Sequence, residues 1–338
     1  MKQRSLIGVS LIVVVLAMAN LFAGQAQKAA SQPAQAGPGS QILPPILDAG
    51  ARLNPLKIAL LKWYLAGATT SFPVGNQPIG LAFDGANIWS ANYGANTVTK
   101  VRATDGQVLG TFKAGIQPFG VTFDGANIWV SGGGAVTKLR ASDGTNLGSF
   151  GVGSYAGWTA FDGTYIWVPT GPNSMVTKLR ASDGATAGTF PVGYGAIAAA
   201  FDGSNVWVTN NGTNTVTKLR ASDGAVLGTF TVGNAPLGIA FDGADMWVAN
   251  RADGTVTELR ASDGAVLGTF STPPGPYGIA FDGKYMWVSG NIEIYVLRAS
   301  DGAVVGSGRL PTTQTGGVAF DGAYVWMAES DANGLVKF

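Results

Sequence analysis

A unit of about 40 residues that repeats seven times constrains the fold of this 338-residue chain more than any other feature. Each unit contains the tripeptide Phe-Asp-Gly, whose aspartate recurs every 38 to 40 residues as Asp84, Asp124, Asp162, Asp202, Asp242, Asp282 and Asp321. A tryptophan follows each aspartate by five residues, as Trp89, Trp129, Trp167, Trp207, Trp247, Trp287 and Trp326. A fixed period of this length indicates one small structural element used repeatedly.

Each unit divides into four short segments that are rich in β-branched and aromatic residues and are separated by glycine-rich turns. In the fifth unit these segments are 238–241, 246–249, 255–260 and 265–269. Four strands in such a period are typical of a propeller blade. The 50 glycines and the lack of a 3.6-residue period exclude a helical solenoid. The sequence therefore predicts an all-β fold, a seven-bladed β-propeller with four-stranded antiparallel blades, over residues 69–338.

The two ends of the array indicate how the ring closes. Residues of about 70–75 match the outermost strand of a unit and precede the first complete unit, whereas the last unit stops within its third strand at Phe338. We expect the N-terminal strand to pair with residues of about 334–338 and to complete the seventh blade. This pairing would remove the open sheet edges that invite aggregation.

The first residues have the features of a secretory signal peptide. Lys2 and Arg4 precede an apolar run and then small residues suited to cleavage after Ala19 or Ala26. An uncleaved membrane anchor is the alternative interpretation. We assign residues 1–26 to the signal peptide and expect the protein to be secreted or periplasmic.

Two further segments precede the array. Residues 27–54 are rich in Gln, Ala, Pro, Gly and Ser and predict a flexible linker. Residues 55–67 begin with a proline that suits the first turn of a helix and carry Leu60, Trp63 and Tyr64 on one side. We expect one short helix that packs against an end of the propeller, with a membrane-surface role as the alternative.

The composition excludes several classes of chemistry. The chain has no histidine and no cysteine, so it lacks the usual general base near neutral pH, the commonest metal ligand, a thiol nucleophile and disulfides. A formal net charge of +1 argues against a nucleic-acid partner held by a basic surface. We expect no cofactor, no nucleic-acid partner, no membrane span after signal cleavage, and a monomer.

Most of the repeated polar residues have structural interpretations. Asp-Gly pairs mark two tight turns per unit, where the aspartate accepts backbone hydrogen bonds and the glycine takes a positive φ. Each repeated tryptophan is expected to fill space between neighbouring blades. An arginine three residues before the second turn aspartate is expected to pair locally or between blades. Seven acidic residues lie outside these turns: Asp48, Asp245, Asp253, Asp331, Glu258, Glu293 and Glu329.

The unit resembles the YVTN and NHL-type propeller repeats of bacterial exported proteins, and also the streptogramin (virginiamycin B) lyase group of seven-bladed propellers. The resemblance covers residues 69–338 and implies the fold. Enzymes of the lyase group use a catalytic histidine with acidic residues and magnesium, and this chain has no histidine. We therefore assign no catalytic residue, and a non-enzymatic role is favoured over lyase activity.

Comparison of the seven units separates two kinds of loop. The turns between the first and second and between the third and fourth strands are nearly identical throughout. The loops between the second and third strands and between successive units vary, and they are predicted to share one face of the disc, the variable face, where propellers present ligand sites. The candidate ligand-binding residues on this face are Tyr93, Phe119, Tyr155, Trp158, Tyr194, Arg251, Asp253, Tyr277, Glu293 and Glu329.

Two features of the variable face invite specific hypotheses. Trp158 stands where most units have glycine, which indicates a plug of the central channel or a ligand platform, with sequence drift in a tolerant loop as the alternative. Glu329, Asp331 and Asn333 place oxygen ligands at alternate positions before a glycine, as in a calcium loop. This segment lacks the later bidentate carboxylate, so a solvated loop is the favoured interpretation.

Three hypotheses about function follow. The first is an exported binding or scaffolding module that recognises a protein, peptide or glycan through the variable face. The second is an enzyme of the streptogramin lyase type, which the missing histidine disfavours. The third is a purely structural surface protein.

Overall fold

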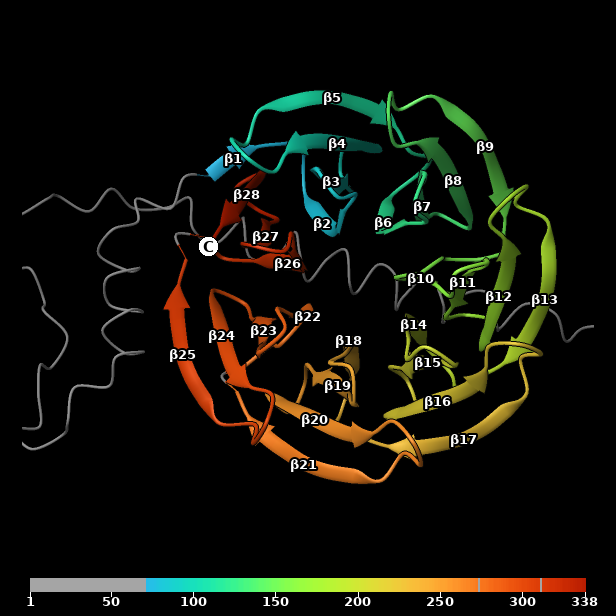
Figure 1. Cartoon of the computed structure of the whole chain (residues 1–338), viewed down its shortest axis with the longest axis vertical. Coiled ribbons are helices and arrows are strands. Elements are labelled where there is room, and N and C mark those ends of the chain that lie inside the picture. Colours follow the sequence, from blue (N-terminus) through green and yellow to red (C-terminus); the bar gives the residue numbers. More distant parts are fainter. Residues whose placement is uncertain (1–70, 273, 311) are drawn as a thin grey trace, which may run out of the picture. The chain divides into compact units, whose positions relative to one another are not determined.

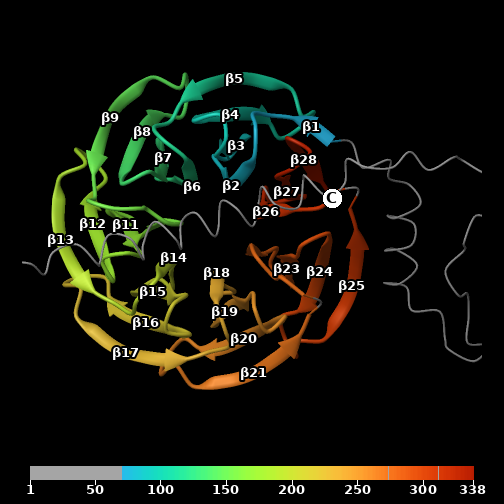
Figure 2. The same cartoon turned by 180° about the vertical axis from the view of Figure 1, so that it is seen from behind.

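The computed structural model describes residues 71–272, 274–310 and 312–338, which form seven four-stranded antiparallel sheets arranged as the blades of a propeller (Figures 1 and 2). The predicted signal peptide, the linker and the helix at 55–67 lie outside the described residues. Within the described part of the chain there is no helix of the length and apolarity that crossing a membrane requires.

The first three blades each use four consecutive strands. Blade 1 contains β2 (Pro78–Phe83), β3 (Asn87–Asn92), β4 (Thr97–Arg102) and β5 (Val108–Lys113). Blade 2 contains β6 (Pro118–Phe123), β7 (Asn127–Gly132), β8 (Ala135–Arg140) and β9 (Asn146–Gly151). Blade 3 contains β10 (Ala160–Phe161), β11 (Tyr165–Thr170), β12 (Met175–Arg180) and β13 (Thr186–Pro191).

The next three blades repeat this order. Blade 4 contains β14 (Ala196–Phe201), β15 (Asn205–Asn210), β16 (Thr215–Arg220) and β17 (Val226–Thr231). Blade 5 contains β18 (Pro236–Phe241), β19 (Asp245–Asn250), β20 (Thr255–Arg260) and β21 (Val266–Ser271). Blade 6 contains β22 (Ile279–Phe281), β23 (Tyr285–Ser289), β24 (Glu293–Arg298) and β25 (Val304–Arg309). In each blade the first strand lies nearest the centre and the fourth lies at the rim (Figure 1).

Blade 7 joins the two ends of the described chain. It contains β26 (Thr315–Phe320), β27 (Val325–Glu329), β28 (Gly334–Lys337) and, as its outermost strand, β1 (Ser71–Pro73). β1 runs antiparallel to β28, with Phe72 opposite Leu335. The Phe72 ring packs against Trp326 of the same blade in a tilted arrangement, with centroids 5.3 Å apart. The predicted closure of the ring is confirmed, and the strands are slightly shorter than expected.

The Phe-Asp-Gly aspartate holds the repeated tryptophan by a side-chain hydrogen bond. In blade 4, Asp202 accepts from the indole Nε1 of Trp207 at 2.7 Å, and its other oxygen accepts from the backbone N–H of Ser204 and Asn205. The same indole bond occurs in all seven blades at 2.6 to 2.8 Å. Gly203 follows with a φ of 95°, as the turn requires.

The tryptophans lie between blades, as predicted, and most are fully buried. Trp207, for example, belongs to one apolar cluster with Met246, Val248 and Leu259 of blade 5. Burial of each tryptophan side chain contributes on the order of 3 kcal/mol of hydrophobic stabilisation. Packing of the repeated tryptophans between neighbouring blades therefore stabilises the ring.

A lysine on the third strand adds a polar link to the next blade. Lys178, which is buried, donates to the backbone carbonyl of Ala221 at 2.6 Å while its ammonium group lies 4.9 Å from the centroid of Trp167. Equivalent links at 2.6 to 2.7 Å are made by Lys100, Lys138, Lys218 and Lys337. At this position blades 5 and 6 have Glu258 and Val296 instead.

The third-strand arginines pair locally and not between blades. Each binds the turn aspartate three residues later at 2.6 to 3.1 Å, and both side chains of every pair are about half exposed. Exposed pairs of this kind contribute roughly 0 to 1 kcal/mol. These arginines therefore fix the shape of a turn and contribute little to stability.

Candidate functional site

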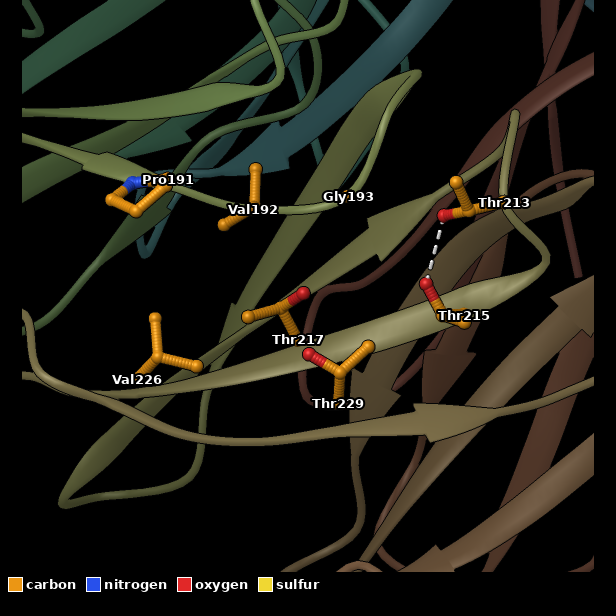
Figure 3. Close-up of a pocket in the computed structure, with 8 residues that line it drawn as sticks. All are labelled: Pro191, Val192, Gly193, Thr213, Thr215, Thr217, Val226 and Thr229. Atoms are coloured by element: carbon orange, nitrogen blue, oxygen red, sulfur yellow. Dashed lines mark hydrogen bonds between the residues drawn. The ribbon is translucent and has the colours of Figure 1, made fainter.

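A groove lies between blades 3 and 4 (Figure 3), and Tyr194 is the variable-face candidate that directly follows one of its lining residues, Gly193. It has a volume of about 410 Å³ and is lined by Pro191, Val192, Gly193, Thr213, Thr215, Thr217, Val226 and Thr229. No lining residue ionises, so the groove offers no acid or base. Thr217 and Thr229 are opposite each other on adjacent strands, and the same pair recurs as Thr99 with Thr111, Thr177 with Thr189 and Thr257 with Thr269. Because these threonine pairs recur in several blades, we interpret them as structural features of the repeat and not as a ligand site.

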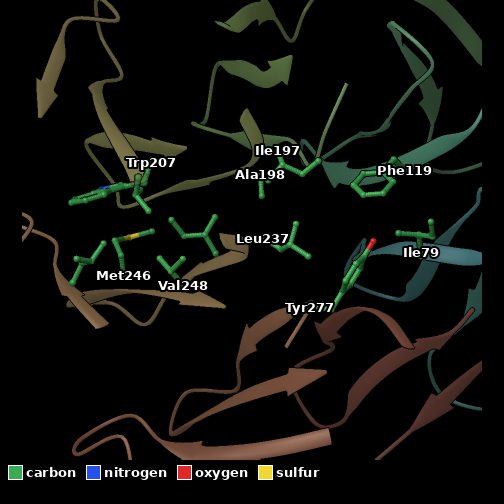
Figure 4. Close-up of a cluster of buried hydrophobic side chains, with 12 residues drawn as sticks. Ile79, Phe119, Ile197, Ala198, Trp207, Leu237, Met246, Val248 and Tyr277 are labelled. Carbon is green, nitrogen blue, oxygen red and sulfur yellow. The ribbon is translucent and has the colours of Figure 1, made fainter. Parts of the chain in front are cut away.

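The centre of the ring is filled by apolar side chains from the innermost strands. Each comes from the residue that follows the first position of the innermost strand in the repeat: Ile79, Phe119, Ile197, Leu237 and Tyr277. All five are buried and belong to one cluster, in which side chains of five blades approach one another (Figure 4). Of these five residues, only Phe119 and Tyr277 are among the ligand-binding candidates predicted from the sequence.

Neighbouring innermost strands approach so closely that the next position is usually glycine. A Cβ added at Gly80 would lie 2.2 Å from the carbonyl oxygen of Phe119, and one added at Gly238 would lie 2.5 Å from that of Tyr277. In blade 3 the close approach is made one residue earlier, by Gly157, whose added Cβ would lie 1.9 Å from a carbonyl oxygen of blade 4. Blade 3 therefore also needs a glycine at this contact, but one residue earlier than in most other blades.

This one-residue displacement allows a tryptophan to stand at the glycine position. The backbone N–H of Trp158 donates to Ile197 at 2.8 Å, and the Trp158 carbonyl accepts from Ala199 at 3.0 Å. The innermost strands of blades 3 and 4 are therefore joined by their backbones at this point. The innermost strand of blade 3, β10, is reduced to two residues.

The Trp158 ring reaches aromatic residues of two other blades. Its centroid lies 4.6 Å from that of Phe119 in blade 2 and 5.1 Å from that of Tyr277 in blade 6. Phe119 also makes an edge contact with Tyr155 at 5.4 Å. We call Tyr93, Phe119, Tyr155, Trp158 and Tyr277 the aromatic cluster. Tyr93, Tyr155 and Trp158 are half-buried, so the cluster is not sealed from solvent.

The polar groups of the aromatic cluster are three phenols beside a guanidinium group. The carbon of the Arg251 guanidinium lies 5.8 Å from the Tyr277 ring centroid, a cation–π geometry. Burial raises the pKa of Tyr93, Tyr155 and Tyr277, and the pKa of Tyr155 is raised further because the other two phenols are near. The three hydroxyls therefore stay protonated at neutral pH and can donate hydrogen bonds.

The remaining variable-face candidates lie apart from the aromatic cluster. Tyr194 is 47% exposed and lies against the Gly212 loop of its own blade. Asp253 accepts from the backbone and side-chain N–H groups of Asn234 at 2.6 and 2.7 Å. Glu293 accepts from the hydroxyl of Tyr295. The structure thus brings together six of the ten candidates, the aromatic cluster and Arg251.

The three residues considered as calcium ligands are each bonded to different parts of the protein. Glu329 is buried and accepts from Ser71 on β1 at 2.7 Å, and burial raises its pKa. Asp331 accepts from the hydroxyls of Thr312 and Thr313, and Asn333 accepts from the backbone N–H of Gln77 at 2.9 Å. Among the described residues no group of three or more acidic side chains is arranged to hold a metal ion.

The carboxyl group of Glu258 has a strongly raised pKa, and it lies between blades, away from the aromatic cluster. Burial raises the pKa of Glu258 to about 7, and the nearby carboxylates of Asp245 and Asp242 raise it in the same direction. Glu258 stands at the position of the inter-blade lysines, where the corresponding carbonyls of blade 6 belong to Ala299 and Ser300. Burial between blades and two neighbouring carboxylates thus account for the raised pKa of Glu258 at a position that other blades use for the inter-blade lysine.

Replacing Glu258 by lysine is expected to stabilise the protein by about 1–2 kcal/mol at pH 7, since a charge-assisted bond to the carbonyls of blade 6 replaces a half-buried carboxylate. In the wild type, the folded state binds the Glu258 proton more tightly than the unfolded state does. The contribution of Glu258 to stability therefore falls as pH rises from 4.5 to about 7. Thermal unfolding measured from pH 4.5 to about 7 should show this decrease in stability for the wild type and not for E258K.

Glu258→Gln is the matched control for this variant. The glutamine variant should also lack the decrease in stability between pH 4.5 and about 7. It cannot form the ammonium link, so it should gain less stability at pH 7 than the lysine variant. A lysine variant that is less stable than the wild type at pH 7 would contradict the assignment of this position to the inter-blade link.

Comparisons with known proteins support the fold. No protein-family model matches the chain, and neither does any curated protein. Among solved structures, hydrazine synthase of Kuenenia stuttgartiensis aligns with a TM-score of 0.68 at 16% identity, over 80% of this chain and 97% of that chain. A streptogramin B lyase structure aligns with a TM-score of 0.67 at 18% identity, over 79% of this chain and 96% of that chain. At these identities the similarity extends to the fold, and the chain is a seven-bladed β-propeller repeat protein that resembles the streptogramin lyase group.

Proposed function

We propose that this protein is an exported binding module whose ligand contacts the aromatic cluster and Arg251 on the variable face. The observation that carries the proposal is the position of Trp158, which joins aromatic residues of blades 2 and 6 and interrupts the glycine pattern of the repeat. The other blades meet at the centre without a tryptophan at this position, so ring closure alone does not require one.

The chemistry of the cluster suits recognition better than catalysis. Aromatic side chains offer large contact areas at a small entropic cost, and phenol hydroxyls add directional hydrogen bonds. Neither histidine nor cysteine is present to serve as base or nucleophile, and the acidic side chains of the variable face are held by neighbouring hydroxyl or amide groups. Lyase activity is therefore not proposed, although a lyase shares the fold.

Binding can be tested with a microarray that carries oligosaccharides and peptides, probed with the fluorescently labelled protein. We expect binding to one class of probe, and Tyr93→Ala and Trp158→Ala should each reduce the signal at least tenfold, because each removes an aromatic contact. Circular dichroism and thermal unfolding confirm that the variants are folded.

Tyr324→Ala is the matched control, because Tyr324 is a 48% exposed tyrosine that follows an Asp-Gly turn on the face opposite the variable loops. It should leave the array signal unchanged. The proposal fails if the wild type binds no probe, or if the two cluster variants and the control bind the same probes equally well.

A further inference from the structure

Arg251 carries an unpaired charge beside the aromatic cluster. It lies in the loop after β19, half-buried, with its backbone N–H bonded to Ala235 at 3.1 Å. The third-strand arginines are all paired with turn aspartates, but in the described part of the chain no carboxylate comes within ion-pair distance of Arg251. A half-buried guanidinium without a counter-ion favours the binding of an anion.

Acidic side chains of the same face are engaged elsewhere. Asp253, two residues from Arg251, accepts two bonds from Asn234, and Glu293 accepts from Tyr295. Glu329 is buried against Ser71. These bonds hold the carboxylates away from the guanidinium, so the charge of Arg251 remains available.

The groups around Arg251 are rich in donors and poor in acceptors. Within the described residues, the hydroxyls of Tyr93, Tyr155 and Tyr277 make no hydrogen bond to another protein group, and each can donate one. A carboxylate has about four acceptor sites and therefore matches a guanidinium with adjacent phenols. The half-buried ring of Trp158, which packs on the buried ring of Phe119, offers apolar surface for a ring that bears the carboxylate.

We infer that the ligand is an acidic oligosaccharide, whose uronic acid carboxylate binds Arg251 and the cluster phenols while its sugar ring packs on the aromatic side chains. This inference rests on the proposed function, because it assigns the chemical class of the ligand to the same site. A sugar is favoured over a linear acid because its apolar ring face suits the aromatic surface, and its hydroxyls can accept hydrogen bonds from phenols that the carboxylate does not reach.

Isothermal titration calorimetry of the full chain with tri-galacturonate tests the inference. The neutral control is galactotriose, which lacks the carboxylates. We expect tri-galacturonate to bind at least tenfold more tightly than galactotriose at low salt, and its affinity should fall as sodium chloride is added. Arg251→Gln should weaken tri-galacturonate binding at least tenfold, and Arg251→Lys should weaken it less.

Arg309→Gln is the matched control, since Arg309 is an exposed arginine on the outermost strand of blade 6. It should not change the affinity for tri-galacturonate. A triglutamate peptide serves as a second acidic probe and should bind more weakly than tri-galacturonate.

Three results would overturn the inference: no binding of tri-galacturonate, equal affinity for the acidic and neutral sugars, or full affinity in R251Q. Tighter binding of triglutamate would overturn the assignment to a sugar. If galactotriose binds and Tyr93→Ala abolishes that binding, the proposed function stands while the inference about charge fails. Failure of the proposed function requires that variants of the aromatic cluster leave the binding of every probe unchanged.

Discussion

Replacing Phe72 by alanine is expected to lower the free energy of unfolding by about 3 kcal/mol or more, since loss of a packed phenylalanine leaves a cavity. Phe72 packs against Trp326 and contacts the turn of blade 1 so closely that a Cβ at Gly106 would overlap it. It is the one residue of the three in β1 that is not exposed. Its loss should therefore detach β1, and urea unfolding at pH 7 measures the effect.

Phe112→Ala is the matched control for the Phe72 variant. Phe112 holds the same position in blade 1, with its ring 5.5 Å from that of Trp89, but it belongs to the six-residue β5. The control should lose similar packing energy without opening the ring. If both variants left the backbone amides of β28 equally protected from hydrogen exchange, the closing role of Phe72 would be wrong.

Replacing Asp202 by alanine is expected to cost about 3 kcal/mol, because the buried indole N–H of Trp207 then has no acceptor. The turn also loses the bonds that Asp202 accepts from the backbone of Ser204 and Asn205 at 2.9 and 2.6 Å. Each bond contributes modestly, but an unsatisfied buried donor carries its full desolvation cost. Urea unfolding measures the loss, and near-ultraviolet circular dichroism reports the packing of the tryptophan.

Asp223→Ala separates this effect from the general loss of a turn aspartate. Asp223 lies at the other Asp-Gly turn of blade 4, where it pairs with Arg220 at 2.9 Å and is about half exposed. Its loss should cost under about 1 kcal/mol, and added salt should reduce the difference. Equal losses in the two variants would contradict the assigned role of Asp202.

The repeat was enough to predict the blades and the closure of the ring. Strand assignment was reliable because seven copies of one pattern each carry the same turn residues, so tertiary context changes little from blade to blade. In blade 5 the predicted 238–241 became Pro236–Phe241 and the predicted 265–269 became Val266–Ser271. Strand ends were less predictable because they depend on backbone pairing at the margins of each strand, which the pattern of side chains does not define to the residue.

The centre of the ring was harder to predict, because its contacts join residues that are far apart in the sequence. Aromatic character alone predicts Phe119 and Tyr277, but it does not point to Ile79, Ile197 and Leu237, which belong to the same cluster. Their shared place in the repeat is the signal that would have found them. The one-residue displacement in blade 3 was not predictable from Trp158 alone, since it depends on the carbonyl that Gly157 approaches.

Blade 6 shows another substitution that the pattern conceals. Gly308 stands where other blades carry the phenylalanine that packs on the repeated tryptophan. The last residue, Phe338, stacks on Trp287 with centroids 6.2 Å apart. A residue from the neighbouring blade thus supplies the missing ring, and only the three-dimensional arrangement reveals this exchange.

The pairing of β1 with β28 closes the ring, and the arrangement of the variable loops on one face depends on this closure. The chain has no cysteine, so the double variant Ser71→Cys with Val336→Cys tests this pairing without competing thiols. These residues are opposite each other in the antiparallel register, whereas Ser71 and Leu335 are one residue out of register. Mild oxidation followed by mass spectrometry of the digested protein should therefore detect an intramolecular disulfide in the 71–336 variant and little in a 71–335 variant. Absence of the disulfide from the 71–336 variant would contradict the closed ring.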